Sequence, residues 1–253
     1  MGEYDAPIYL YDKLESSNRT AKTLALEGDA PRHDGADKSA DGGTGAGWGG
    51  GSRARRGKVI YLSLVLRPGL PMTEAQAVTV SAAVAVCRAV KRLCGLDLGI
   101  KWVNDLYYNG KKVCGILTEA GADIESGQLE WLVVGIGLNL TSRPEDWPEE
   151  LRPIAGSLVP RRACTGEPGG TCRGHVAREL LGLCPDFDCL DEYRTRCFVP
   201  GHWVTVCTGT ESYAAKAVDI DDAGRLIVQR EGGRTEALCH GEVSIRPSPL
   251  AVK

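Results

Sequence analysis

The sequence predicts an α+β chain in which a large region of strands and helices precedes a small barrel of short strands. Its 253 residues suffice for one large domain and one small domain. Helix and strand patterns follow one another through the first part, and from Gly201 short strands alternate with tight turns. We therefore expect two domains, residues 1–198 and 199–253.

The overall composition excludes several classes of function. The formal net charge is −3, so no global charge attracts the chain to nucleic acid or to an anionic membrane. We find no apolar run long enough to span a bilayer and no signal-peptide pattern. The ten cysteines form no Cys-x-x-Cys pair, and several lie in apolar periodic segments, where buried free thiols are normal: Cys87, Cys94, Cys114 and Cys207. These features predict a cytoplasmic, reduced protein.

The N-terminal elements are a short strand and a helix. Ile8–Tyr11 is apolar and aromatic, as strands are. The helix is expected over Arg19–Glu27, ending at Gly28, with Ser17 or Asn18 as its N-cap.

Residues 29–58 differ sharply in composition, being rich in Gly, Ala, Asp and Arg. This composition is typical of a long mobile loop. Its end, Gly49 to Lys58, combines glycines that allow close approach to a ligand with arginines that can clamp an anion. A flexible basic linker is the alternative interpretation.

The next elements form the core of the large region. Val59–Leu66 is a strand, and Thr73 to Gln76 reads as a capping box that opens a helix ending at Gly95. Gln128–Leu140 is a strand whose Gly135 and Gly137 are typical of positions that a ligand approaches.

The stretch from Lys101 to Glu119 predicts a hairpin that turns at Asn109-Gly110, the pair favoured in type I′ turns. The ideal register pairs Tyr108 with Lys111, Tyr107 with Lys112, Leu106 with Val113 and Asp105 with Cys114.

Because side chains alternate between faces, this register places Lys101, Asp105 and Lys112 on one face. Trp102, Leu106 and Val113 then occupy the other face, although a β-bulge would invert part of this pattern. Two ammonium groups beside a carboxylate suit an anionic substrate with a metal ion. The alternative is an ordinary amphipathic hairpin with solvated lysines.

The last third of the chain is expected to hold two helices and a barrel. The helices cover His175–Leu183 and Asp188–Arg196. The barrel strands are Trp203–Cys207, Tyr213–Ile220, Arg225–Gln229, Arg234–Leu238 and Val243–Ile245.

The hairpin string resembles the central motif of biotin protein ligases. That family carries Lys-Trp-Pro-Asn-Asp, a short hairpin, then Gly-Ile-Leu and an acidic residue, and here Val103 replaces the proline. Glu15 to Asn18 is similar to the family's Asp-Ser-Thr-Asn, and Asn139 ends a Gly-x-Gly-x-Asn string. The resemblance extends from Leu14 to Arg246.

The resemblance leaves two registers open for the glycine-rich loop. Residues 53–57 can stand for the family's Arg-Gly-Arg-x-Gly, or residues 46–49 for its Ala-Gly-Arg-Gly. We prefer the first because the chemistry needs cations. The apolar strand that precedes this loop in the family is missing between Pro31 and Gly45.

The resemblance implies a mixed sheet with helices on one face, followed by an SH3-like barrel. It implies ATP-dependent attachment of biotin to a lysine of a biotin carboxyl carrier protein or domain through biotinyl-5′-AMP, with Mg²⁺. No helix-turn-helix precedes Tyr9, so no DNA partner is expected, and the chain is expected to be a monomer or weak homodimer.

The family's site residues map onto this sequence in overlapping groups. The catalytic group is Lys112, Arg55, Asp105 and Lys101. The biotin-binding group is Ser16, Ser17, Asn18, Arg53, Ala54, Arg55, Lys112 and Gly115. The ATP-binding group is Arg53, Arg55, Arg56, Lys101, Asn104 and Asn139, and Asp105 is expected to bind Mg²⁺, directly or through water.

Two other functions fit parts of this pattern. A lipoate or octanoate ligase shares the chemistry, but the Lys-Trp-x-Asn-Asp string and the C-terminal barrel disfavour it. A non-catalytic biotin-binding paralogue would fit the altered loop, but such a protein needs no metal ligand like Asp105.

Overall fold

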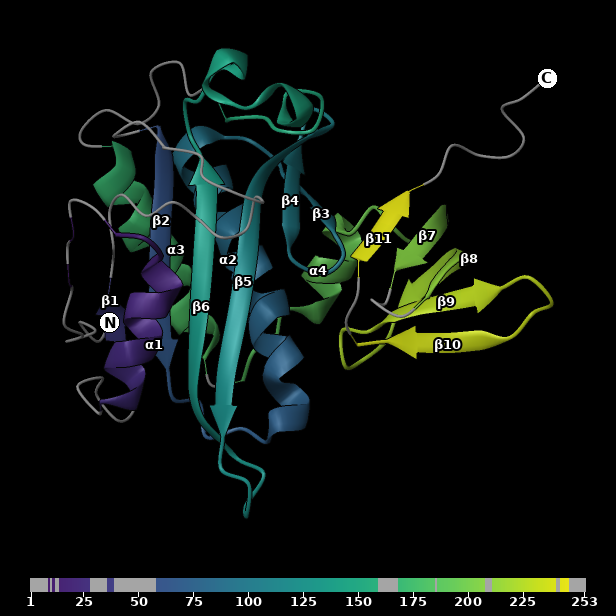
Figure 1. The fold of residues 1–253 in the computed structure, drawn as a ribbon, viewed down its shortest axis with the longest axis horizontal. Helices are drawn as coiled ribbons and strands as arrows, with labels where there is room; N and C mark the ends of the chain where they lie inside the picture. The colour runs from purple at the N-terminus through teal and green to yellow at the C-terminus, as the bar shows by residue number, and fades with distance from the viewer. Residues whose placement is uncertain are drawn as a thin grey trace.

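A computed structural model describes residues 9, 11, 14–27, 36–38, 58–158, 168–184, 186–207, 211–239 and 242–245. Two sheets lie side by side, a six-stranded large sheet and a five-stranded small sheet (Figure 1). Of the strand predicted at residues 8–11, the structure describes only Tyr9 and Tyr11, and neither lies in a strand. Most of the predicted 29–58 loop lies outside the described residues.

The strands of the large sheet are arranged in the order β1-β2-β6-β5-β4-β3. Their bounds are β1 (Ala36–Lys38), β2 (Val59–Leu66), β3 (Gly99–Lys101), β4 (Asp105–Tyr108), β5 (Lys111–Ala122) and β6 (Leu129–Asn139). Neighbouring strands pair antiparallel, and isolated parallel bridges join Ile100 to Cys197 and Lys112 to Ala155.

Strand β1 lies inside the segment that we predicted to be one continuous loop, and that prediction is wrong at residues 36–38. The strand pairs with the outer edge of β2, with Asp37 opposite Leu64. Pairing at a sheet edge uses backbone N–H and C=O groups, so it does not require apolar side chains.

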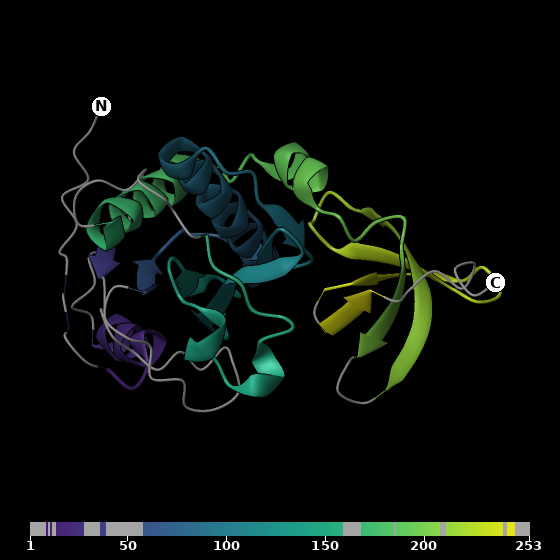
Figure 2. The ribbon, with the colours of Figure 1, turned by 90° about the horizontal axis from the view of Figure 1, so that it is seen from above.

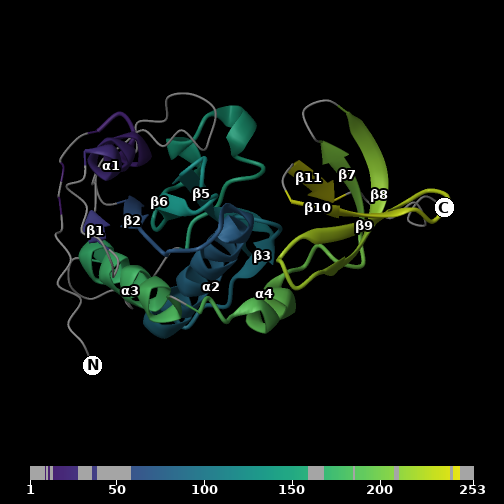
Figure 3. The same cartoon turned by 90° about the horizontal axis from the view of Figure 1, so that it is seen from below.

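Helices occupy both sides of the large sheet. Helices α2 (Ala75–Cys94) and α3 (Pro168–Leu183) cover one face, and α1 (Ser17–Leu26) lies on the other (Figures 2 and 3). The first face is apolar, with alternate residues of β2, β5 and β6 buried beneath α2 and α3: Ile60, Leu62, Leu64, Ile116, Val134, Ile136 and Leu138. On the second face, Ala21 and Ala25 of α1 pack on Val65, Trp131 and Val133.

The start of α2 corrects the predicted capping box. A 3₁₀ turn, η1 (Met72–Glu74), precedes the helix, and the N-cap residue Glu74 makes no side-chain capping bond. The amide of Gln76 instead donates to the carbonyl of Gly224, far along the chain. The predicted end at Gly95 is confirmed, and its φ of 69° is the left-handed conformation of a helix C-cap.

The small sheet follows α4 (Leu190–Arg196), and its strand order is β10-β9-β8-β7-β11. The strands are β7 (Trp203–Cys207), β8 (Ser212–Ile220), β9 (Leu226–Arg230), β10 (Thr235–Leu238) and β11 (Glu242–Ile245), each within one residue of its predicted bounds. Buried apolar side chains from both sheets form one cluster.

The composition also predicts buried thiols and no membrane-spanning helix. Cys87 and Cys114 are buried free thiols as predicted, whereas Cys207 is exposed because it ends β7. Within the described part of the chain, no helix has both the length and the apolarity to cross a membrane.

Candidate functional site

The β4–β5 hairpin carries the predicted charged residues, and its turn forms as predicted. Asn109 and Gly110 have φ of 48° and 73°, which a type I′ turn requires. Tyr108 pairs with Lys111 and Tyr107 with Lys112.

Beyond these two pairs a β-bulge changes the register, so the predicted pairs Leu106–Val113 and Asp105–Cys114 are wrong. Leu106 pairs with Cys114 and Asp105 with Gly115, which leaves Val113 as the extra residue. Val113 and Cys114 are 0% and 1% exposed. The bulge lets two successive apolar residues enter the core, which a regular strand cannot do.

The bulge preserves the predicted meeting of charges. The Lys112 Nζ lies 2.6 Å from the Asp105 Oδ1, and the two side chains are 15% and 20% exposed. Lys101 is the backbone partner of Asp105 in β3, which places it on the same side of the sheet. A largely desolvated ammonium group beside a carboxylate can bind an anion and a cation next to each other.

Beside this ion pair, two neighbouring residues of the sheet have no side chain. Asp105, Gly115, Gly137 and Tyr61 form one row across β4, β5, β6 and β2. A Cβ at Gly115 would lie 3.4 Å from Lys112 Cε and 3.8 Å from Asp105 Oδ1. A Cβ at Gly137 would lie 3.7 Å from the Tyr61 ring, so Gly115 is the glycine whose missing side chain favours a ligand directly next to Lys112 and Asp105.

The next row across the sheet is formed by Leu117, Gly135 and Ser63, and α1 lies over it. A Cβ at Gly135 would lie 1.9 Å from Asn18 Oδ1, so glycine is required for α1 to sit this close. Leu117 is 45% exposed although it belongs to a central strand. An apolar side chain is therefore accessible to solvent in the row next to Gly115.

The polar residues of α1 divide into a cap and a buried cluster. Ser16, not Ser17 or Asn18, is the N-cap, and its Oγ accepts from the Arg19 N–H. Ser17 and Asn18 contact the buried hydroxyl of Ser63 at 2.8 and 2.7 Å. The predicted N-caps are wrong because Ser63, inside an apolar strand, offers both residues a buried partner.

Asn18 also fastens α1 to β5. Its amide donates to the Leu117 carbonyl and to the Glu119 carboxylate, at 3.1 and 3.2 Å. Our sequence reasoning missed Ser63 and Glu119. The signal for Ser63 was a small polar residue in the middle of an apolar strand.

The two predicted asparagines hold the backbone around the site. The Asn104 amide donates to the Ile116 carbonyl at 2.6 Å, and the Ile116 N–H donates back to the Asn104 carbonyl at 2.9 Å. The Asn139 amide donates to the Gly156 carbonyl at 3.0 Å. Arg53, Ala54, Arg55 and Arg56 lie outside the described residues.

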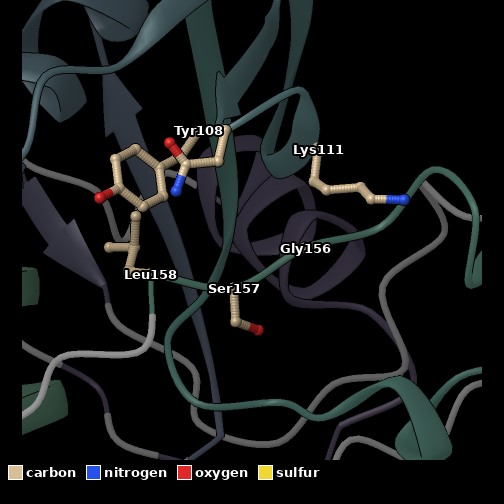
Figure 4. Close-up of a pocket in the computed structure, with 6 residues that line it drawn as sticks. Tyr108, Lys111, Gly156, Ser157 and Leu158 are labelled. Atoms are coloured by element: carbon tan, nitrogen blue, oxygen red, sulfur yellow. The ribbon is translucent and has the colours of Figure 1, made fainter.

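Lys111 belongs to a different environment from Lys112. It lines a cavity of about 320 Å³ at the hairpin tip, together with Tyr108, Asn109, Gly156, Ser157 and Leu158 (Figure 4). Its ammonium group donates to the Pro153 carbonyl. The two consecutive lysines are therefore not equivalent, as the alternation predicted.

The donor set bears on the predicted metal ion. Among the described residues no three His, Cys, Asp or Glu side chains gather as a metal cage. Mg²⁺ commonly takes one or two carboxylates and completes its coordination with water and substrate phosphates. The single carboxylate of Asp105 therefore fits Mg²⁺ that is held mainly by a nucleotide.

Comparison with known protein families identifies two matching regions. A family model described as "Biotin/lipoate A/B protein ligase family" matches residues 43–139. A second, described as "Biotin protein ligase C terminal domain", matches residues 201–246. The first match contains the hairpin, and the second contains all five strands of the small sheet.

Whole-chain relatives agree with these matches. The bifunctional ligase/repressor BirA of Bacillus subtilis is 34% identical over 248 residues, which are 92% of this chain and 71% of the relative. A biotin–[acetyl-CoA-carboxylase] ligase of Mycobacterium tuberculosis is 30% identical over 215 residues, 79% of this chain and 72% of the relative.

Solved structures show the same fold. The apo biotin protein ligase of Aquifex aeolicus superposes with a TM-score of 0.72 at 21% identity, covering 96% of this chain and all of that one. The same enzyme in complex with biotin and ATP gives a TM-score of 0.68 at 22% identity, covering 95% and 97%.

Proposed function

The chain belongs to the biotin protein ligases, and from this we propose that it joins biotin to a lysine of a biotin carboxyl carrier domain at the expense of ATP. The observation that carries the proposal is the Lys112–Asp105 ion pair beside the paired glycines Gly115 and Gly137.

The reaction proceeds in two steps. In the first, a biotin carboxylate oxygen attacks the α-phosphorus of ATP, and the bond to the β-phosphate breaks, giving biotinyl-5′-AMP and pyrophosphate. In the second, the neutral amine of the acceptor lysine attacks the carbonyl carbon of this mixed anhydride, and AMP leaves. The first step brings two anionic groups together, and the second releases AMP and the proton that the amine loses, so the protein contributes mainly charge neutralisation and positioning.

Lys112 is proposed to bind the biotin carboxylate and then the acyl oxygen of the adenylate. Its side chain is 15% exposed and its ammonium group is held against Asp105, so the cation is already positioned and largely desolvated. The biotin rings would lie along the glycine surface near Gly115, with Ser16, Ser17 and Asn18 at the end covered by α1.

Lys101 and Asp105 are proposed to serve the nucleotide. Lys101 would contact the phosphates, and Asp105 would hold Mg²⁺, which supplies positive charge to the phosphate oxygens when bound. Asn104 and Asn139 are proposed to shape the nucleotide side of the site, because each holds a backbone carbonyl beside it.

The arginines of the glycine-rich segment complete the proposal. Arg53, Arg55 and Arg56, with Ala54, would close over the two anions and offset the repulsion between carboxylate and phosphate. This part of the proposal rests on the sequence string alone.

Acyl-adenylate formation tests the proposed function. The protein is incubated with ATP and Mg²⁺ and with either biotin or lipoate, and the products are analysed by mass spectrometry. We expect biotinyl-5′-AMP and pyrophosphate from biotin, and no lipoyl-5′-AMP from lipoate. Lipoyl-5′-AMP alone would indicate a lipoate ligase, and biotin binding without any adenylate would indicate a non-catalytic binder.

A carrier domain then tests the acceptor. Biotin should appear on the carrier's lysine and be absent from a carrier in which that lysine is arginine. Equal labelling of the two carriers would contradict specific transfer.

A further inference from the structure

The three-residue connection between Lys101 and Asp105 is held by three different parts of the molecule. The Trp102 indole N–H donates to the Gly224 carbonyl at 3.0 Å. The Tyr193 hydroxyl of α4 donates to the Val103 carbonyl at 2.9 Å. Asn104 is bonded to β5. The positions of Lys101 and Asp105 therefore depend on contacts outside their own hairpin.

Gly224 is the contact from the small sheet, and it lies in the turn between β8 and β9. Its carbonyl accepts twice from the large-sheet side, from Trp102 and from the Gln76 amide at 2.6 Å. Trp102 is 3% exposed, so its indole N–H has no access to water that could replace this acceptor.

The turn is built to present this carbonyl. The Asp221 carboxylate accepts from the Ala223 and Arg225 N–H groups at 3.0 and 2.9 Å, which fixes the turn internally. Gly224 has a φ of 75°, and a Cβ there would lie 2.9 Å from Val80 Cγ2 of α2. The turn thus needs glycine at this position, both for its positive φ and for its close packing against α2.

A second link ties the same turn to α4. Arg194 donates to the Ile220 carbonyl at 2.9 Å and to the Asp222 carboxylate at 2.7 Å. The neighbouring residue Tyr193 donates to the Val103 carbonyl, so the turn and α4 hydrogen-bond to adjacent residues of the connection. Movement of the small sheet would therefore be transmitted to residues 102 and 103 together.

We propose that the β8–β9 turn of the small sheet positions the nucleotide half of the active site, with Gly224 and Gln76 as positioning residues that act through Trp102 on Lys101 and Asp105. The assignment of Lys101 and Asp105 to ATP and Mg²⁺ rests on the proposed function. Lys112 lies in β5, outside this connection, so the turn should affect ATP far more than biotin.

Two matched pairs of variants test this. Gly224→Ala is compared with Gly232→Ala, which also changes a positive-φ glycine in a turn of the small sheet but has nothing within 4 Å of its added Cβ. Gln76→Glu is compared with Gln229→Glu, whose amide donates to the Gly233 carbonyl in that second turn. Thermal unfolding, biotin affinity by calorimetry, and the KM for ATP and kcat of adenylation are measured for each.

We expect Gly224→Ala and Gln76→Glu to raise the KM for ATP by about tenfold and to leave biotin affinity nearly unchanged. The two control variants should keep the wild-type KM, even if Gly232→Ala lowers the unfolding temperature as much as Gly224→Ala. If Gly224→Ala does not fold, the KM for ATP and the biotin affinity of Gln76→Glu, compared with those of Gln229→Glu, decide whether the proposal holds. Equal kinetics within each pair, or parallel loss of biotin and ATP binding, would overturn the proposal.

A readout without ligands separates this inference from the proposed function. The indole N–H resonance of Trp102, assigned with Trp102→Phe in ¹⁵N-tryptophan-labelled protein, should shift in Gly224→Ala and Gln76→Glu and stay in place in both controls. An unmoved resonance would refute the coupling. If the resonance shifts in the two variants as expected but the wild-type protein makes no adenylate, the proposed function alone is refuted.

Discussion

The ammonium group of Lys112 lies 2.6 Å from the carboxylate of Asp105, across the two strands of one hairpin. The two residues face each other as the alternation of side chains predicts, although Val113 is an extra residue in the ladder and Gly115, not Cys114, lies opposite Asp105. In the ligand-free protein each charge thus partly satisfies the other. A ligand carboxylate and a metal ion would have to share or replace this contact, which links the roles of the two residues.

Lys112→Ala should weaken biotin binding and slow adenylate formation. The variant loses a charge-assisted contact in a largely desolvated place, which contributes about 1.5–3 kcal/mol, or roughly one to two decades in affinity. Calorimetry with biotin and an adenylation assay measure both effects.

Lys111→Ala is the matched control, because Lys111 donates to the Pro153 carbonyl and not to Asp105. We expect near wild-type biotin affinity in this variant. Equal losses at the two lysines would contradict the assignment of the site to the Lys112 face of the hairpin.

Asp105→Asn should abolish the Mg²⁺-dependent step and leave biotin binding equal or tighter. The amide keeps the shape of the carboxylate but cannot neutralise a divalent cation, and Lys112 loses the anion that competes with biotin. The measurements are biotin calorimetry and a Mg²⁺ titration of pyrophosphate release. Weaker biotin binding with a normal Mg²⁺ response would show that the roles are assigned wrongly.

Gly115→Ala should block the ligand without damaging the fold. Its Cβ would have ordinary contacts, 3.4 Å from Lys112 Cε, so the unfolding temperature should stay near wild type while biotin affinity falls. Thermal unfolding and biotin calorimetry are run on the same preparation.

Gly135→Ala is the contrasting variant on the same face. Its Cβ would lie 1.9 Å from Asn18 Oδ1, so α1 must shift, and such overpacking costs about 1–3 kcal/mol of stability. The idea that Gly115 serves the ligand would fail if Gly115→Ala bound biotin normally or lost stability as Gly135→Ala does.

Asp221→Asn should destabilise the protein at neutral pH and have little effect in acid. Burial raises the pKa of the Asp221 carboxyl, but hydrogen bonds from Arg225 and Ala223 outweigh it and hold the pKa below its usual 3.8. A depressed folded-state pKa gives stability that is present above the unfolded value and is lost as pH falls through the folded value. Denaturant unfolding at pH 7 and at pH values below 3.8 should show a gap between variant and wild type that closes in acid. A gap independent of pH would mean that the carboxylate charge does not hold the turn.

The local elements of this protein could be predicted from its sequence. The Asn109-Gly110 turn, the end of α2 at Gly95 and the strands of the small sheet all formed within a residue or so of expectation. Each depends on dihedral preferences and on periodicity over a few residues, which the sequence states directly. The meeting of Lys112 and Asp105 followed from the same local rules.

Partner choice over long distances could not be predicted. Ser16 caps α1 because Ser17 and Asn18 find Ser63, which lies more than forty positions along the chain. Gln76 bonds to Gly224 and not to its own helix end. The bulge at Val113 forms because the core accepts two successive apolar residues. In each case the alternatives differ little in local energy, and burial decides between them. A buried polar group must find a hydrogen-bond partner, and a core must be filled. Only the packed structure fixes which partners are within reach.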